Sequence, residues 1–219
     1  MNFWDNLMGS DEVAGEYMLS YGEGPGAETR RQLGNFINDG ETVLDVGCGP
    51  GWNLDHFVDH GPKIKKYLGL DYSERFVRGA TLRAVGKIHE FVESGIEFGE
   101  DPPYQKGDVR NIEQPDSSWD VVIMQDVLEH TNGYEKPVKE AVRVMKKRAI
   151  FTFWHLMDKE EDNPVNDDGD DGWGAWYSKS KFEKYLDTLD LHWLHHQFNY
   201  PANRVRDFYI VDKEVKHGV

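Results

Sequence analysis

Apolar runs alternate with helix-period segments along most of the chain. Five short runs are predicted to be strands, at residues 42–46, 66–70, 103–107, 120–124 and 149–154, and the run at 103–107 has the weakest apolar pattern of the five. Between them apolar residues recur at the spacing of amphipathic helices, with one face formed by Leu54, Phe57 and Val58 and another by Val138, Ala141, Val142 and Met145. This alternation predicts an α/β fold with a mostly parallel sheet wound with helices.

The pattern changes at both ends of this region. Residues 155–179 are acidic, contain glycines and end in aromatic residues, which predicts a long loop on the substrate side. Ser180 and Glu183 form a capping box for a helix whose apolar face is Phe182, Tyr185, Leu186 and Leu189. The runs 191–198 and 207–212 follow without a crossover helix, so we expect an antiparallel pair. Residues 1–26 precede a helix at 27–37 and are predicted to cap the sheet's carboxyl edge.

Length and charge narrow the classes of protein. The chain has 219 residues, which predicts a single domain over residues 1–219. Its net charge of -15 disfavours nucleic acid and anionic lipid as partners. Cys48 is the only cysteine, which excludes an intramolecular disulfide and suits a reducing compartment. Because no apolar run approaches a membrane span and the first residues lack a basic leader pattern, we expect a soluble cytoplasmic protein.

The stretch "VLDVGCGPGWNL" at residues 43–54 places three glycines between a strand and a helix. A dinucleotide site needs G-x-G-x-x-G, but Trp52 or Leu54 occupies the position of the third glycine. A P-loop would need a Lys followed by Ser or Thr, which is missing here. The loop is therefore predicted to let a flat ligand approach its backbone closely without holding a phosphate.

Two later carboxylates follow neighbouring strands. Asp71 ends the second strand, twenty positions after Gly51, where a carboxylate can accept hydrogen bonds from both hydroxyls of a ribose. Asp108 follows the third strand and can accept from an exocyclic amine on a base. Asp71 therefore indicates a ribose, with or without a phosphate, whereas Asp108 alone is a weak signal for a base.

The segments "VLDVGCGPG", "LGLDYS", "GDVRNI" and "WDVVIMQDVLEH" together resemble the class I S-adenosylmethionine-dependent methyltransferases. The resemblance covers about residues 40 to 154, and "VLEH" is similar to the subgroup with the ubiquinone-biosynthesis and other small-molecule methyltransferases. It implies a Rossmann-like, seven-stranded, mostly parallel sheet with an antiparallel terminal strand and helices on both faces. It also implies a cofactor site for S-adenosylmethionine, left as S-adenosylhomocysteine, formed by Asp45, Gly47, Cys48, Gly49, Gly51, Asp71, Tyr72, Asp108, Val109, Gln125 and Asp126.

Candidate catalytic residues are fewer. Because a sulfonium donor is already activated, the protein mainly positions the reactants, and a base is needed only for a protonated acceptor. His130 and His155 are the candidate bases, although a packed histidine that ties the helix to the strand is the simpler interpretation of His130. Asp126 and Glu129, three residues apart, are alternatively a capping pair for a short helix.

Several other features carry simpler interpretations. No frame of the acidic run 158–171 satisfies a calcium-loop pattern, so a solvated loop is expected. The neighbouring aromatic residues are interpreted as core anchors or as a lid over the acceptor: Trp173, Trp176 and Tyr177. Three histidines of the run 191–198 fall partly on opposite strand faces, so no metal is predicted: His192, His195 and His196.

The sequence thus predicts an S-adenosylmethionine-dependent methyltransferase that acts on an O, N or C nucleophile of a small molecule. One alternative is a partner subunit that binds the nucleoside without turnover, and another is a methyltransferase of tRNA or protein. A nicotinamide-dependent oxidoreductase is opposed by Trp52.

Overall fold

The computed structural model describes Gly22 and residues 25–98, 102–154, 156–162, 175–200 and 204–213. These residues form two compact units, divided between Val109 and Arg110, which are described separately below. The predicted cap at residues 1–26 lies outside the described residues except for positions 22, 25 and 26. The prediction of a single domain stays a prediction.

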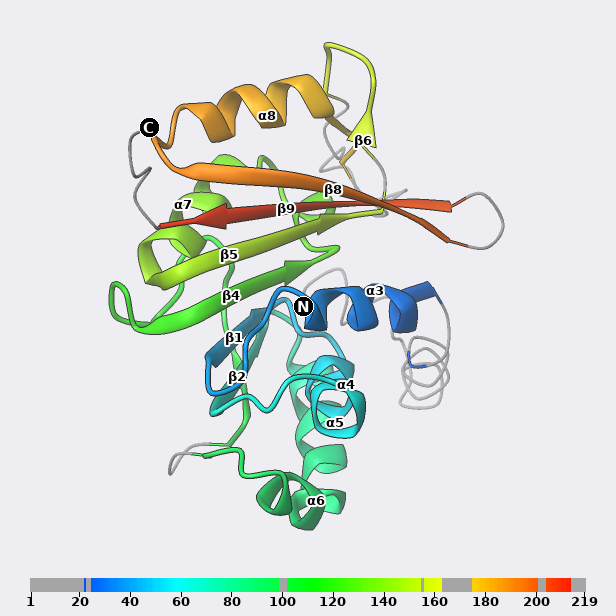
Figure 1. Ribbon diagram of the computed structural model, residues 1–219, viewed down its shortest axis with the longest axis vertical. Helices are drawn as coiled ribbons and strands as arrows, with labels where there is room; N and C mark the ends of the chain where they lie inside the picture. Colours follow the sequence, from blue (N-terminus) through cyan, green and yellow to red (C-terminus); the bar gives the residue numbers. More distant parts are fainter. Residues whose placement is uncertain are drawn as a thin grey trace. The chain divides into compact units, whose positions relative to one another are not determined.

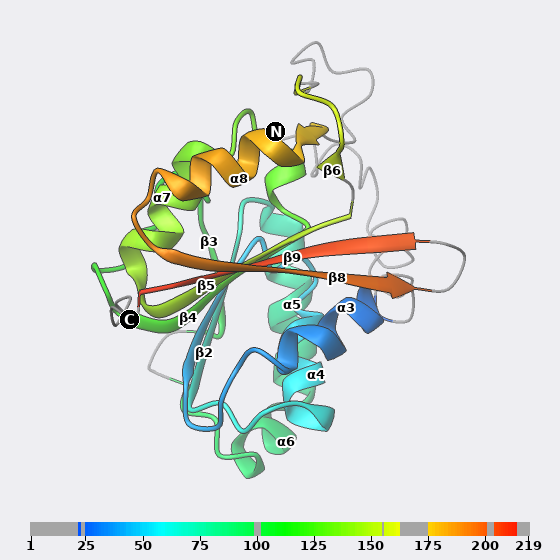
Figure 2. The ribbon, with the colours of Figure 1, turned by 45° about the horizontal axis from the view of Figure 1, so that its top comes forward.

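The first unit contains three parallel strands. They are β1 (Thr42–Val46), β2 (Lys66–Asp71) and β3 (Tyr104–Lys106), and β2 pairs with both of the others. The residues of β1 and β2 are almost all buried, as expected for a parallel sheet covered by helices. The helices are α3 (Pro25–Gly34), α4 (Trp52–His60), α5 (Glu74–Gly86) and α6 (Ile88–Glu93). Helices α3 and α4 lie side by side in both views (Figures 1 and 2).

The second unit begins with β4 (Trp119–Gln125), which pairs in parallel with β5 (Met145–Phe153). Between these strands come the short 3₁₀ helix η1 (Leu128–His130) and α7 (Glu135–Val144), while β6 (Leu156–Met157) pairs with β7 (Tyr177–Ser178). Helix α8 (Lys179–Asp187) follows, and the unit ends with β8 (His192–Tyr200) and β9 (Arg204–Asp212). Figure 2 shows α7 and α8 next to each other, where the Tyr185 hydroxyl donates to the carbonyl of Glu135 at 2.8 Å.

Strand β9 runs antiparallel to both of its neighbours. It pairs with β5 on one side and with β8 on the other, so the strand that comes later in the chain lies between two earlier ones. The complete strand order is β3-β2-β1-β4-β5-β9-β8. The predicted fold class, an α/β protein with a seven-stranded, mostly parallel sheet, is confirmed.

Two local predictions in the second unit were wrong. Met145, expected on a helix face, begins β5, because α7 ends at Val144 and Met145 has extended backbone angles. The expected capping box of Ser180 and Glu183 is absent, because Ser178 is the N-cap of α8 and its hydroxyl accepts from the amide of Lys181. The Glu183 carboxylate instead accepts a hydrogen bond from the Tyr209 hydroxyl at 2.9 Å.

The ends of the acidic loop are fixed by contacts within this unit. Asp162 accepts from the backbone amide of Ser178 at 2.7 Å, and the Tyr177 hydroxyl donates to the carbonyl of Thr131. Tyr177 is buried, as expected for a core anchor, whereas Trp176 is 47% exposed. Trp173 lies outside the described residues.

Candidate functional site

The glycine loop, residues 47–51, follows β1 in the first unit and is hydrogen-bonded to the end of β2. The amides of Gly47 and Cys48 both donate to the carbonyl of Leu70, at 2.6 and 3.0 Å. Gly47, Gly49 and Gly51 have φ values of 77°, 52° and 79°, in the left-handed region that disfavours residues with a side chain. Glycine at alternate positions is therefore required by the backbone path itself.

The glycines differ in what lies beside them. A Cβ at Gly51 would lie 2.4 Å from the Cζ of Tyr104, a buried residue of β3 whose hydroxyl donates to the Gly51 carbonyl at 2.8 Å. A Cβ at Gly49 would meet no heavy atom within 4 Å among the described residues. Gly51 is thus required by packing, whereas Gly49 faces open space in which a ligand could approach the backbone.

Asp71, at the end of β2, fixes the middle of the glycine loop. One carboxylate oxygen accepts from the amide of Gly49 at 2.8 Å, and the other accepts from the amide of Ser73 at 2.8 Å. The second contact also positions Ser73, which is the N-cap of α5. Asp71 therefore fixes the backbone of the loop in addition to its predicted role with ribose. The side chain of the next residue, Tyr72, is 47% exposed.

Asp45 is a buried carboxyl group at the start of the glycine loop. Its Oδ2 accepts from the Tyr67 hydroxyl at 2.7 Å and from the Asn53 amide at 3.0 Å, whereas its Oδ1 has no partner among the described residues. Burial raises the pKa of Asp45 to about 6, and the two hydrogen bonds and the charge of Arg30 oppose that shift. A cationic donor beside Oδ1 would stabilise the ionised form.

Some residues around the glycine loop were missed by the sequence reading. Tyr67 and Asn53 lie in elements with a clear apolar pattern, and Tyr104 lies in the weakest of the predicted strands. All three are buried, but these patterns do not indicate which polar contacts their side chains make. Arg30 of α3 is 3% exposed, donates to the carbonyl of Gly22 at 2.8 Å and lies close enough to lower the pKa of Asp45. Cys48 is buried, and burial raises the pKa of its thiol, which indicates a packing role for the side chain.

Asp108 and Val109 follow β3 at the end of the first unit, and both are half-buried. The preceding residue, Gly107, donates its amide to the carbonyl of Asp71 at 2.9 Å. A Cβ at Gly107 would lie 3.1 Å from the Cβ of Leu70, so this segment runs close against β2. The chain therefore places Asp108 next to the end of the strand that carries Asp71.

The second unit contributes the turn after β4, residues 126–130. Asp126 has a φ of 54°, which is rare for a residue with a side chain and costs about 1 kcal/mol. Thr152 of β5 compensates, because its hydroxyl donates to Asp126 Oδ1 at 2.9 Å while the amide of Asp126 donates to that hydroxyl and to the carbonyl of Thr152. Arg206 Nη2 lies 3.5 Å from Asp126 Oδ2.

Buried polar atoms without a hydrogen-bond partner in the part of the chain that the structure describes include the Nε2 of Gln125, at the end of β4, and the Oε2 of Glu129 in the turn. The other Glu129 oxygen accepts from the amide of Trp154 at 2.8 Å. Burial, followed by the charge of Asp126, raises the pKa of Glu129 well above its ordinary value.

The alternative that Asp126 and Glu129 cap a short helix was wrong. The N-cap of η1 is Val127, and no side chain caps this helix. The imidazole of His130 is packed with its centroid 6.2 Å from that of Trp154, and burial lowers its pKa to about 4. His155, the other candidate base, lies outside the described residues.

The structure therefore brings the predicted residues together in two groups. In the first unit these are Asp45, the glycine loop with Cys48, Asp71 and Tyr72, with Asp108 and Val109 after β3; in the second they are Gln125, Asp126 and His130. Within the described ranges, no group of three or more His, Cys, Asp or Glu side chains is arranged to hold a metal ion. Among the same residues, no helix is both long and apolar enough to cross a bilayer.

Comparison with known proteins identifies the family. Residues 44–153 match the model of the methyltransferase domain family, which is half of the chain, and the chain belongs to this family. The predicted membership of the class I S-adenosylmethionine-dependent methyltransferase superfamily is thereby confirmed. The match spans both the glycine loop and the turn after β4.

Individual relatives agree with this assignment. The chain is 30% identical over 51% of its length to a probable S-adenosylmethionine-dependent methyltransferase of Mycolicibacterium smegmatis, covering 37% of that protein. It is 28% identical over 52% of its length to a ubiquinone biosynthesis O-methyltransferase of Idiomarina loihiensis, covering 42% of it. The chain thus spans less than half the length of these curated relatives.

A solved structure supports the fold. Magnesium protoporphyrin IX methyltransferase from Synechocystis PCC 6803, solved with bound S-adenosylmethionine, has a TM-score of 0.59 and 18% identity. The similarity covers 84% of this chain and 78% of that one. At this identity the likeness concerns the fold alone.

Proposed function

We propose that the protein is an S-adenosylmethionine-dependent methyltransferase that acts on an O, N or C nucleophile of a small molecule. The family match over residues 44–153 carries the proposal. The described residues fit the cofactor on two observations: Gly49 leaves open space beside the loop backbone, and Asp45 Oδ1 lacks a partner among those residues. The methionine part of the cofactor would supply a chain thin enough for the space beside Gly49 and an ammonium group that can donate to Oδ1 of Asp45.

Each group of residues would have a distinct role in this reaction. Asp45 and the glycine loop would bind the methionine part, Asp71 and Tyr72 the ribose, and Asp108 with Val109 the adenine. Gln125 and Asp126 would lie beside the methionine and the methyl group. When bound, the cofactor supplies an activated methyl group, which leaves the sulfonium sulfur for a lone pair of the acceptor while S-adenosylhomocysteine forms.

Proton removal would fall to His130 or His155 if the acceptor is protonated. With a pKa of about 4, His130 is uncharged at neutral pH and holds a proton weakly, which favours positioning over strong base catalysis. Loss of the acidic limb of the pH profile of kcat in His130→Ala or His155→Ala would identify a base, because a base is inactive once it is protonated. An unchanged profile in both variants, with cofactor binding intact, would exclude both residues.

A small molecule is the proposed acceptor for three reasons. The net charge of -15 opposes binding to nucleic acid, and one relative is named for ubiquinone biosynthesis. The "VLEH" segment at residues 127–130 also resembles the subgroup with the ubiquinone-biosynthesis and other small-molecule methyltransferases. Salt-sensitive binding of tRNA at physiological ionic strength would contradict this assignment, and a lack of turnover with every acceptor class despite cofactor binding would favour a partner subunit.

Thermal unfolding with S-adenosylhomocysteine tests the cofactor directly. At about 100 times its dissociation constant the ligand should stabilise the folded protein by about 2.7 kcal/mol. NADH serves as the negative control ligand. No shift with S-adenosylhomocysteine or S-adenosylmethionine in a well-folded sample would overturn the proposal.

A pair of glycine variants separates ligand binding from backbone strain. Gly49 and Gly40 have φ values of 52° and 81°, and a Cβ at either would meet no described heavy atom within 4 Å. Gly49→Ala and Gly40→Ala should therefore destabilise the protein by similar amounts, about 1–2 kcal/mol. Only Gly49→Ala should lose the shift with S-adenosylhomocysteine, because its methyl group would occupy the ligand's approach to the loop.

A further inference from the structure

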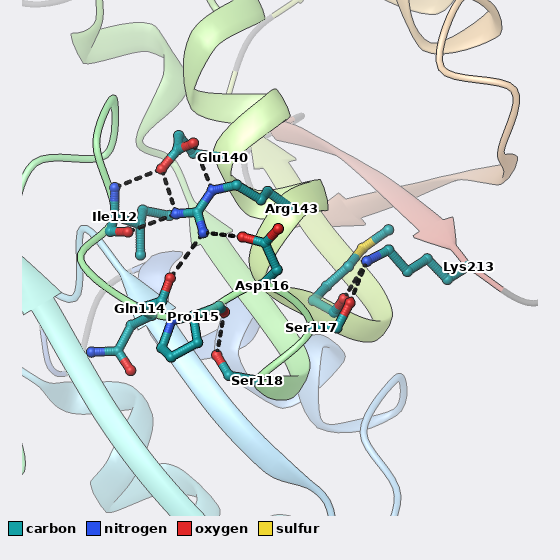
Figure 3. A network of polar contacts seen from close by, with 10 residues as sticks. Ile112, Gln114, Pro115, Asp116, Ser117, Ser118, Glu140, Arg143 and Lys213 are labelled. Carbon is teal, nitrogen blue, oxygen red and sulfur yellow. Dashed lines mark hydrogen bonds and ion pairs between the residues drawn. The ribbon is translucent and has the colours of Figure 1, made fainter.

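A single guanidinium group organises the segment that leads from β3 to β4. Arg143 of α7 donates from Nε and Nη2 to the two carboxylate oxygens of Glu140, at 2.9 and 2.8 Å (Figure 3). It also donates to the backbone carbonyls of Ile112 and Gln114, at 2.7 and 2.9 Å. Its Nη1 also donates to Asp116 Oδ1 at 2.6 Å.

Glu140 completes this arrangement from the same helix. Its Oε2 accepts from the amide of Ile112 at 2.8 Å, so both backbone polar groups of Ile112 are bound by one ion pair. The Glu140 side chain is 19% exposed, whereas that of Asp116 is 78% exposed. Because exposed ion pairs contribute little, the Glu140 pair and the two carbonyls carry most of the constraint.

The helix that holds this pair is itself well anchored. Val138, Ala141 and Val144 of α7 are fully buried, so the backbone beneath Arg143 cannot shift without disturbing the core. The amides of Ser117 and Ser118 donate to the carbonyls of Arg143 and Val144, each at 2.9 Å. Hydrogen bonds with Glu140 raise the pKa of Arg143 and lower that of Glu140, so the pair stays charged across the physiological range.

The position of this pair along the chain matters. Ile112 comes three residues after Val109, so at most about 10 Å of chain separates the clamped residue from the proposed adenine-binding pair. On the other side, Gly107 is bonded to the carbonyl of Asp71. Asp108 and Val109 therefore follow a residue bound within the first unit, Gly107, and precede a residue bound within the second, Ile112, which Arg143 holds.

We propose that Arg143, with Glu140, is a positioning residue for base recognition: it sets the backbone of residues 108–112 so that the proposed cofactor's adenine is distinguished by its exocyclic amine. This inference rests on the proposed function. A cation alone does not suffice for this role, because a lysine cannot donate at once to both oxygens of Glu140 and to two separate carbonyls in a planar arrangement.

The test measures binding of three ligands to the full chain by titration calorimetry. They are S-adenosylhomocysteine, S-inosylhomocysteine, in which an oxo group replaces the amine, and S-ribosylhomocysteine, which has no base. In Arg143→Lys we expect affinity for S-adenosylhomocysteine to fall about tenfold, the value of one neutral hydrogen bond. Affinity for S-ribosylhomocysteine should change less than about twofold, and the preference for the amine over the oxo ligand should be lost.

Two further variants keep the result interpretable. Asp116→Asn removes only the exposed contact and should bind all three ligands as the wild type does. Glu140→Gln keeps an acceptor for the amide of Ile112 but weakens the ion pair with Arg143, so it should show a smaller loss of affinity with the same ligand selectivity. This variant provides the test if Arg143→Lys fails to fold. Equal weakening of all three ligands, or unchanged binding, would overturn the inference alone. A wild-type protein that binds none of them would overturn the proposed function as well.

Discussion

The glycine loop (47–51) and the turn after β4 (126–130) both follow the carboxyl end of a buried parallel strand. In the first, backbone amides bind the carbonyl of Leu70 and the carboxylate of Asp71, and left-handed glycines leave room for Tyr104. In the second, the backbone strain at Asp126 is offset by Thr152, Glu129 is a buried carboxyl group, and His130 is half-buried with its pKa lowered by loss of water contact. The glycine loop is thus stabilised by backbone hydrogen bonds and close packing, whereas the stability of the turn depends on whether Glu129 and His130 are ionised.

The largest expected effect on stability concerns the packing of the glycine loop. Gly51→Ala should lower the free energy of unfolding by about 4 kcal/mol, because its Cβ would overlap the ring of Tyr104 and the residue would be strained. Gly95→Ala, with a φ of 84° and open space around it, should cost only about 1–2 kcal/mol. Urea denaturation of both variants measures the difference, and equal losses would contradict a packing role for Gly51.

The next largest effect concerns the ionisation of His130 in the turn after β4. Burial lowers the pKa of His130 from 6.5 to about 4, so the unfolded chain binds the proton more tightly than the folded protein. The stability from this group is fully present above pH 6.5 and is lost as the pH falls towards 4, by about 3 kcal/mol. Urea denaturation between pH 7 and pH 4 should show this loss in the wild type but not in His130→Gln. Parallel curves would refute the burial of the neutral imidazole.

Glu129 should produce a dependence of opposite sign. Because its pKa is raised in the folded protein, its contribution is complete below pH 4.5 and is lost as the pH rises towards the folded pKa. Glu129→Gln keeps an acceptor for Trp154 and cannot ionise, so its stability relative to the wild type should increase with pH. The expected slope is at most about 1.4 kcal/mol per pH unit, measured by urea denaturation at intervals above pH 4.5. A slope of zero would mean that Glu129 ionises normally.

The smallest effect concerns Asp45, the buried carboxyl group of β1 two residues before the glycine loop. At pH 6, near the pKa of Asp45, an ammonium group bound beside Oδ1 should lower that pKa and release about half a proton per bound S-adenosylhomocysteine. Calorimetric titration in two buffers of different ionisation enthalpy measures the release, which should vanish at pH 8 and in Asp45→Asn. Release that persists in Asp45→Asn would assign the proton to another group.

Much of the fold could be predicted because its signals are local. The strand at 42–46 was predicted with its observed bounds, and the pairing of the last two strands followed from the missing crossover helix. Met145 and Ser180 were misassigned because apolar spacing and capping patterns do not register where a chain turns from helix to strand. Such boundaries depend on tertiary contacts, for example that of Asp162 with the amide of Ser178.

The candidate site was predicted unevenly for a related reason. Glycines and carboxylates at strand ends are visible as residue types, so the residues from Asp45 to Asp71 could be named. The roles of Tyr104, Arg30 and Arg143 depend on contacts between residues far apart in the sequence, which no spacing rule reports. The double function of Asp71, as loop anchor and proposed ribose ligand, was hidden for the same reason.

The place of β9 has a consequence for the order of events during synthesis. Strand β8 leaves the ribosome before β9, yet its pairing in the described sheet is with β9 alone, which in turn is bonded to β5. Until residues 204–212 have emerged, the edge of β5 stays open and β8 has no strand to join. A nascent chain stalled before that point would expose an unpaired strand edge, which is the feature that chaperones recognise and that promotes aggregation.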